Sequence, residues 1–151
     1  MIISKFNKEF PFEVNGKKIT AELFNSPDID ILLYAFNYEG NTDIDKFNEF
    51  NLEILKNMSF DINRPVNSHN YMVVSTTLDY RTYGNAVNQH LKNLGLDITK
   101  WTKQKSNIEL FRTAVMNVNL YTDELKNYYY DGFISEIKRV ISKIIEEDKL
   151  Y

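Results

Sequence analysis

The chain has 151 residues, a formal net charge of −3, no cysteine and 43% hydrophobic residues. This length is typical of one domain and the apolar content is enough for a core, so we expect a single domain over residues 1–151. The lack of cysteine excludes disulfides, thiolate nucleophiles and cysteine-based metal sites.

Residues 9–24 predict a β-hairpin. Apolar and polar residues alternate on both sides of Asn15-Gly16, and this dipeptide favours the positive φ angles of a type I′ turn. Such a turn gives the hairpin one apolar side. The expected cross-strand pairs are Val14–Lys17, Phe12–Ile19 and Phe10–Ala21.

Two helices are expected next, over residues 27–38 and 43–58. The first follows Ser26-Pro27 and has apolar residues at helical spacing, although its run Ile31–Phe36 also fits a buried strand. The second begins at a sequence that resembles a capping box, Thr42 to Asp45. Residues 59–70 then predict a loop, and residues 71–77, rich in β-branched side chains, predict a strand.

Three more helices are expected over residues 82–94, 106–120 and 123–149. Gly95 favours a Schellman end for the first, Ser106 and Glu109 form a capping box for the second, and Gly132 favours a kink or break in the third. Together the elements predict a mainly helical α+β fold. An N-terminal β-hairpin plus one or more further strands would pack against about five helices.

No catalytic constellation stands out. His69 and His90 lack a second histidine at helical spacing, and the isolated glycines form no phosphate-binding loop. A serine-nucleophile elbow is also missing. Function has to be argued from a site, so the sequence predicts a protein that is not an enzyme, with no catalytic residues, no metal site and no cofactor.

An acidic ridge is the first candidate interaction surface. Asp45, Glu49 and Glu53 follow one another at i+4 spacing on the predicted 43–58 helix, where like charges destabilise the helix. We expect this ridge, together with Glu39, to contact a basic protein partner. A solvated helix face is the alternative that the sequence leaves open.

Two further candidate surfaces carry aromatic residues. Tyr128, Tyr129 and Tyr130 cover most of one helical turn, so two of the rings lie at least partly outside the core; Tyr128 and Tyr130 are the predicted partner contacts. A second segment joins the single tryptophan to three lysines, as in sites for single-stranded nucleic acid. Its residues are Lys100, Trp101, Lys103 and Lys105. The alternative is a solvated loop with Trp101 folded onto the core.

No stretch of the sequence predicts a membrane span. The longest apolar run has six residues, Ile31–Phe36, whereas a spanning helix needs ~20. Lys5 and Lys8 interrupt the N-terminus, which therefore does not resemble a secretory signal. We expect a cytoplasmic protein.

The leading functional hypothesis is a protein-binding protein that acts by occupying a partner's surface. Phage-type or mobile-element inhibitors (anti-defence proteins, nuclease inhibitors) and toxin-immunity proteins fit this description, with a basic nucleic-acid-binding host protein as the partner. Eighteen Asn, fifteen Ile and fourteen Lys against four Ala and four Arg suggest AT-rich codons and a low-GC bacterium or its phage. The alternative is a virion assembly or tail chaperone protein, and a nucleic-acid-binding module ranks third because no broad basic field exists.

Overall fold

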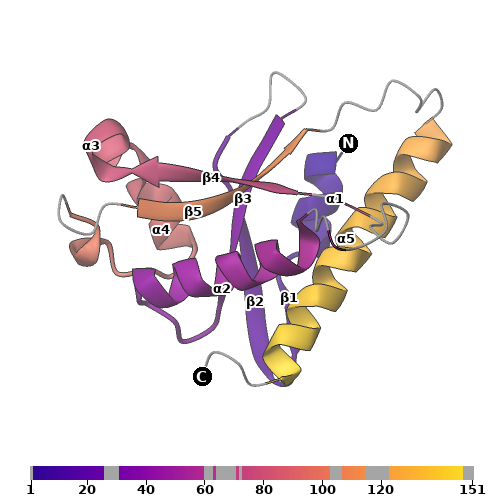
Figure 1. Cartoon of the computed structure of the whole chain (residues 1–151), viewed down its shortest axis with the longest axis horizontal. Helices are drawn as coiled ribbons and strands as arrows, with labels where there is room; N and C mark the ends of the chain where they lie inside the picture. Colours follow the sequence, from indigo (N-terminus) through magenta and orange to yellow (C-terminus); the bar gives the residue numbers. More distant parts are fainter. Residues whose placement is uncertain are drawn as a thin grey trace.

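The computed structural model describes residues 2–25, 31–59, 63, 71, 73–102, 107–114 and 123–147. These residues form an antiparallel five-stranded sheet with helices on both faces (Figure 1). The strands lie in the order β1-β2-β3-β5-β4. In chain order the elements are α1 (Ile2–Glu9), β1 (Phe12–Val14), β2 (Lys17–Leu23), β3 (Ile31–Tyr38), α2 (Ile44–Met58), β4 (Val74–Asp79), α3 (Tyr80–Tyr83), η2 (Gly84–Val87), α4 (Asn88–Asn93), η3 (Ile98–Lys100), β5 (Asn107–Ala114) and α5 (Asp123–Glu146).

The N-terminal hairpin is confirmed. Asn15 and Gly16 have φ angles of 49° and 73°, as a type I′ turn requires. Two of the three expected pairs are present, Val14–Lys17 and Phe12–Ile19. The third is wrong because β1 begins only at Phe12, and Ala21 pairs on its other side with Phe36 of β3.

The predicted balance of helix and strand is wrong, because two expected helices are strands. The segment 27–38 contains β3, and the segment 106–120 contains β5. β3 is the central strand and is buried over most of its length. A strand that is buried on both faces has no polar alternation, so its apolar run matched helical spacing by coincidence.

The second misassigned helix has a different cause. Glu109, taken as the end of a capping box, lies on β5 and accepts a hydrogen bond from the Thr77 hydroxyl at 3.1 Å. Ile108 and Phe111 of the same strand belong to two different core clusters. The fold is α+β as predicted, but it is built on a full antiparallel sheet. The prediction of a mainly helical fold, in which a hairpin and one or more further strands pack against about five helices, is wrong because five strands form one sheet.

The sequence did not predict α1, but the remaining helices follow the sequence more closely. The expected helices 43–58 and 123–149 are α2 and α5, and the expected strand 71–77 is β4, which begins later at Val74. The segment 82–94 is divided among α3, η2 and α4. α4 ends in the predicted Schellman motif, in which Leu96 N donates to Leu91 O and Gly95 N to Lys92 O, both at 2.9 Å.

Two core clusters lie on opposite faces of the sheet. One joins the sheet to α1, α2 and α5, with Phe36 and Phe111 among its buried strand residues. The other joins it to η2, α4 and the segment around Trp101, with Ala35 and Leu110 from the strands. Neighbouring residues of a strand point to opposite faces, which is why Ala35 and Phe36 fall in different clusters.

The sheet divides in the middle, and α2 fills the division. β3 and β5 pair as far as Tyr34 and Phe111 and then separate (Figure 1). Beyond that point Asn51 of α2 takes the place of a neighbouring strand. Its Oδ1 accepts from Phe36 N at 3.0 Å, and its Nδ2 donates to Phe36 O at 2.9 Å.

Asn48 does the same for β5. Its Nδ2 donates to Asn107 O and its Oδ1 accepts from Glu109 N, both at 2.9 Å. One turn of α2 thus satisfies backbone groups of both separated strands, which would otherwise be costly to bury. The same insertion lets Ile44 and Phe47 of α2 join the cluster on the other face.

α5 remains helical through Gly132, so the break predicted there is not found. A side chain at position 132 would collide with the Tyr71 hydroxyl. The Tyr71 ring lies edge-on to Tyr129 and Phe133, with centroids 5.3 and 5.6 Å away. The glycine therefore makes room for a tyrosine that packs against the helix.

Candidate interaction surfaces

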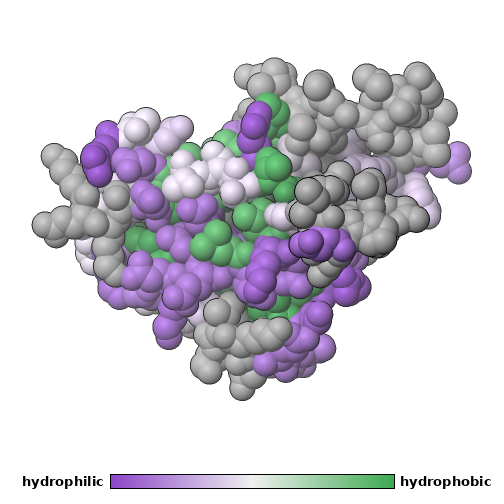
Figure 2. All heavy atoms as spheres, in the orientation of Figure 1, coloured by the Kyte–Doolittle hydropathy of each residue, from purple (hydrophilic) through white to green (hydrophobic). Residues whose placement is uncertain are grey.

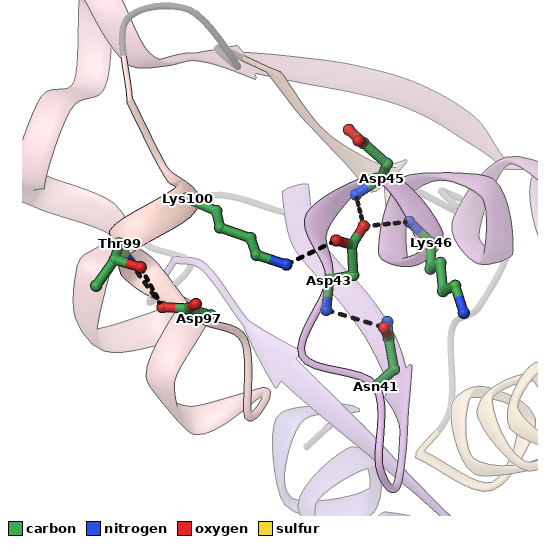
Figure 3. A network of polar contacts seen from close by, with 7 residues as sticks. All are labelled: Asn41, Asp43, Asp45, Lys46, Asp97, Thr99 and Lys100. Carbon is green, nitrogen blue, oxygen red and sulfur yellow. Dashed lines mark hydrogen bonds and ion pairs between the residues drawn. The ribbon is translucent and has the colours of Figure 1, made fainter.

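A polar network joins the start of α2 to the turn at η3 (Figure 3). Asp43 is the N-cap of α2, and its Oδ1 accepts from the backbone N–H groups of Asp45 and Lys46 at 2.9 and 3.2 Å. Its Oδ2 pairs with Lys100 Nζ at 3.0 Å. The expected capping residue, Thr42, lies one position too early. Asn41 completes the arrangement by accepting from Asp43 N at 3.0 Å.

This network has a structural role. The hydrogen bond from Lys100, followed by those from the backbone, holds the pKa of Asp43 below its ordinary value. On the facing turn the Thr99 hydroxyl donates to Asp97 at 2.7 Å, which lowers the pKa of Asp97. The carboxylates therefore stay charged and serve as caps. Lys100, a predicted nucleic-acid contact, is engaged with Asp43.

The remaining predicted nucleic-acid contacts differ in position. The Trp101 side chain is buried, its Nε1 donates to Gly84 O at 2.9 Å, and its ring meets that of Tyr80 edge-on. Base stacking would require the indole to leave the core, so the structure agrees with the alternative in which Trp101 packs inward. Lys103 and Lys105 lie outside the described residues.

The acidic ridge is only partly open to solvent. Asp45 and Glu49 are exposed on α2, whereas Glu53 is half-buried and lies 3.6 Å from Lys56. Glu39 lies apart from the ridge, in the turn after β3. There it lines a shallow hollow of about 230 Å³. The ridge that can meet a partner is therefore centred on Asp45 and Glu49.

The three consecutive tyrosines differ in exposure, because successive residues of a helix point in different directions. Tyr128 is 81% exposed, Tyr129 is half-buried and Tyr130 is buried at 7%. The ring of Tyr129 meets that of Tyr130 edge-on at 6.0 Å. Of the two predicted contacts, Tyr128 is on the surface and Tyr130 belongs to the core.

A histidine–carboxylate pair is the arrangement that sequence reasoning missed. His90 Nδ1 lies 2.8 Å from Glu22 Oε1, and the imidazole stacks on Phe24 at 4.8 Å. Asn93 donates to the same carboxylate oxygen at 2.9 Å. Glu22 and Phe24 are far from His90 in the chain, so no local motif could reveal the pair. His69 lies outside the described residues.

Two further properties describe the mapped part of the chain. Its His, Asp and Glu side chains form no group of three that could hold a metal ion. Its helices include none that is both long and apolar enough to cross a membrane.

Comparison with known proteins reveals the family. The model of the family described as "Tyrosine decarboxylase, C-terminal" matches residues 1–144, so the chain belongs to this family. It is 25% identical over 142 residues to an L-tyrosine decarboxylase from Enterococcus faecium. The matched region covers 94% of this chain and 23% of that protein. An L-tyrosine decarboxylase from Levilactobacillus brevis is 26% identical over 142 residues, with 94% and 22% covered. The chain therefore spans about a quarter of the length of these relatives.

These matches correct the functional prediction. The interpretation as a phage-type inhibitor or immunity protein is wrong, and so is the alternative as a virion assembly protein, because the family is that of a domain associated with an enzyme. The prediction that the protein is not an enzyme is contradicted by the same matches, since both relatives are L-tyrosine decarboxylases, of which this chain covers 23% and 22% of the length. The lack of a catalytic motif did not exclude an enzyme family, because this chain corresponds to about a quarter of the length of its relatives.

Proposed function

We propose that this chain works as the C-terminal domain of an L-tyrosine decarboxylase, in which it binds and supports the catalytic part. The match to the family over residues 1–144 is the observation that carries the proposal. The reaction removes the carboxyl group of L-tyrosine as CO2 and leaves tyramine. A cytoplasmic location is part of the proposal.

The buried polar side chains of the described residues serve the fold. The buried Asn37 and Asn51 donate to backbone carbonyl oxygens, as side chains with a structural role do. Burial raises the pKa of Tyr34, whose hydroxyl pairs with Thr113 at 2.9 Å, so this phenol stays neutral. The exposed Asp45 and Glu49 are the proposed contacts with the rest of the enzyme.

The test replaces the C-terminal segment of the Enterococcus faecium enzyme that matches this chain. Three proteins are compared by release of labelled CO2 from L-tyrosine: the intact enzyme, the enzyme without the segment, and a chimera that carries this chain. We expect the truncated enzyme to lose activity and the chimera to regain it.

Two controls make the result specific. The isolated chain should release no CO2, and the chimera should not accept D-tyrosine. A chimera that folds, as judged by circular dichroism, but stays as inactive as the truncated enzyme would contradict the proposal. Full activity of the truncated enzyme would contradict it too, since the segment would then support nothing.

A further inference from the structure

The two edges of the sheet differ in how they are protected. β1 is three residues long, follows Pro11 and carries the exposed Glu13. Short length, proline and charge are the devices that keep an edge strand from pairing with another chain. β4, at the other edge, has six residues, VSTTLD, and its only charge is the final Asp79.

The surface of β4 is neutral as well as open. Val74, Ser75 and Thr77 are exposed, and no strand of the described chain lies beyond β4. Figure 2 shows pale side chains of near-zero hydropathy along the course of this strand, with both hydrophilic and hydrophobic side chains around them. Such an edge offers unpaired backbone N–H and C=O groups to another strand.

We propose that β4 pairs antiparallel with β4 of a second copy of this chain, so that two sheets join across a twofold axis. A twofold axis at Thr76 sets Thr76 opposite itself, Ser75 opposite Thr77 and Val74 opposite Leu78. No charged side chain of one strand then faces a like charge of the other. Hydroxyls meet on both faces of the sheet, Thr76 with Thr76 on one face and Ser75 with Thr77 on the other. The strand is therefore chemically complementary to itself.

The exposed apolar residues support the same partner. The described surface has four exposed large hydrophobic side chains, and two of them flank β4: Val74 at its start, 57% exposed, and Tyr83 of α3 just past its end, 45% exposed. Antiparallel pairing brings the start of one strand to the end of the other. Val74 of each copy would approach the end that carries Leu78 and Tyr83 of its partner, which removes apolar surface from water.

A contact along one strand is small, so the dimer should be weak and depend on concentration. Sedimentation equilibrium of the 151-residue chain should show an average mass that rises with concentration from 17.8 kDa towards twice that value. A mass that stays at 17.8 kDa up to the solubility limit would overturn the proposal. This test does not involve decarboxylation and can fail independently of the proposed function.

Charge substitution at the axis identifies the interface. Thr76→Lys places two lysines directly opposite each other, and Thr76→Glu does the same with two carboxylates, so each variant alone should be monomeric. A mixture of the two variants should associate again, because lysine then faces glutamate. This recovery shows that neither variant has merely misfolded. Glu13→Lys, which changes the charge of the other edge, should leave the parent's self-association unchanged. Dimers of Thr76→Lys alone, or monomers in the mixture, would refute pairing through β4.

Discussion

Asparagine side chains hold the middle of this domain together. Asn51 copies the hydrogen bonds of a strand residue by accepting from Phe36 N and donating to Phe36 O. Its Nδ2 also donates to Phe47 O of its own helix at 2.8 Å, so all its hydrogen-bonding groups are used. An asparagine inside a helix is a mediocre helix former, and its presence is explained by the strand that it contacts.

Asn51→Leu should therefore be among the most damaging substitutions on α2. Leucine leaves Phe36 N–H and C=O buried without partners, which costs about 1–3 kcal/mol for each group. We expect the free energy of unfolding to fall by about 3 kcal/mol, measured by urea denaturation. Asn57→Leu is the matched control, because within the described residues the hydrogen bonds of the Asn57 side chain go to Glu53 of the same helix. Equal losses for both variants would contradict the role of Asn51.

The Asp43 cap gives a test of pH dependence. Its pKa in the folded protein lies below the ordinary 3.8, so its charge stabilises the fold above pH 3.8, and this contribution is lost as pH falls through the lower folded pKa. Asp43→Asn keeps a capping side chain but removes the charge. The difference in the free energy of unfolding between parent and variant should shrink between pH 5 and pH 2.

Lys100→Met checks the cause of that shift. The hydrogen bond from Lys100 is the largest contribution to the lowered pKa of Asp43. Its loss should make the stability of the protein less dependent on pH over the same range, as followed by urea unfolding at each pH. If the pH dependence of stability is unchanged in Lys100→Met, the backbone hydrogen bonds alone account for the lowered pKa of Asp43.

Elements with strong local signals could be predicted from the sequence, and elements defined by their neighbours could not. The Asn15-Gly16 turn, the apolar stripe of α2 and the Gly95 end of α4 depend on residues close in the chain. β5 owes its structure to pairing with β3 and β4, which lie far from it in the chain, and local spacing does not contain this information. β3 is buried on both faces, so its apolar run fitted a buried strand as well as a helix. Among the candidate sites, Tyr128 could be placed on the surface, but the pairing of Lys100 with Asp43 could not be foreseen.

Gly132 allows a test within a single element. Alanine normally stabilises a helix by about 1 kcal/mol relative to glycine. In α5 the added methyl group would collide with the Tyr71 hydroxyl, and overpacking costs about 1–3 kcal/mol. Gly132→Ala should therefore lower the midpoint of thermal unfolding. In a Tyr71→Phe background the hydroxyl is absent, and the same substitution should be tolerated better. A gain in stability in the parent background would contradict the close approach.

At the scale of the molecule, the proposed function predicts that charge governs association with the catalytic part of the decarboxylase. Reversal of Asp45 and Glu49 to lysine should slow the association of this chain with the truncated decarboxylase, because long-range attraction acts mainly on the association rate. Added salt should slow the parent in the same way. Glu146→Lys, at the C-terminal end of α5, is the control. Surface plasmon resonance measures the association and dissociation rates of each variant. Equal association rates for the parent and for the variant with Asp45 and Glu49 reversed to lysine would show that the acidic ridge does not contribute to binding.

The insertion of α2 between β3 and β5 determines how the domain unfolds. Many sheet proteins can release a covering helix while the strands remain paired. Here the helix supplies the hydrogen bonds of two strands and carries side chains into the clusters on both faces. Loss of α2 would expose Phe36 N–H and Glu109 N–H together and open both clusters at once. Hydrogen exchange should therefore report a single opening free energy for α2, β3 and β5, as in one cooperative unit.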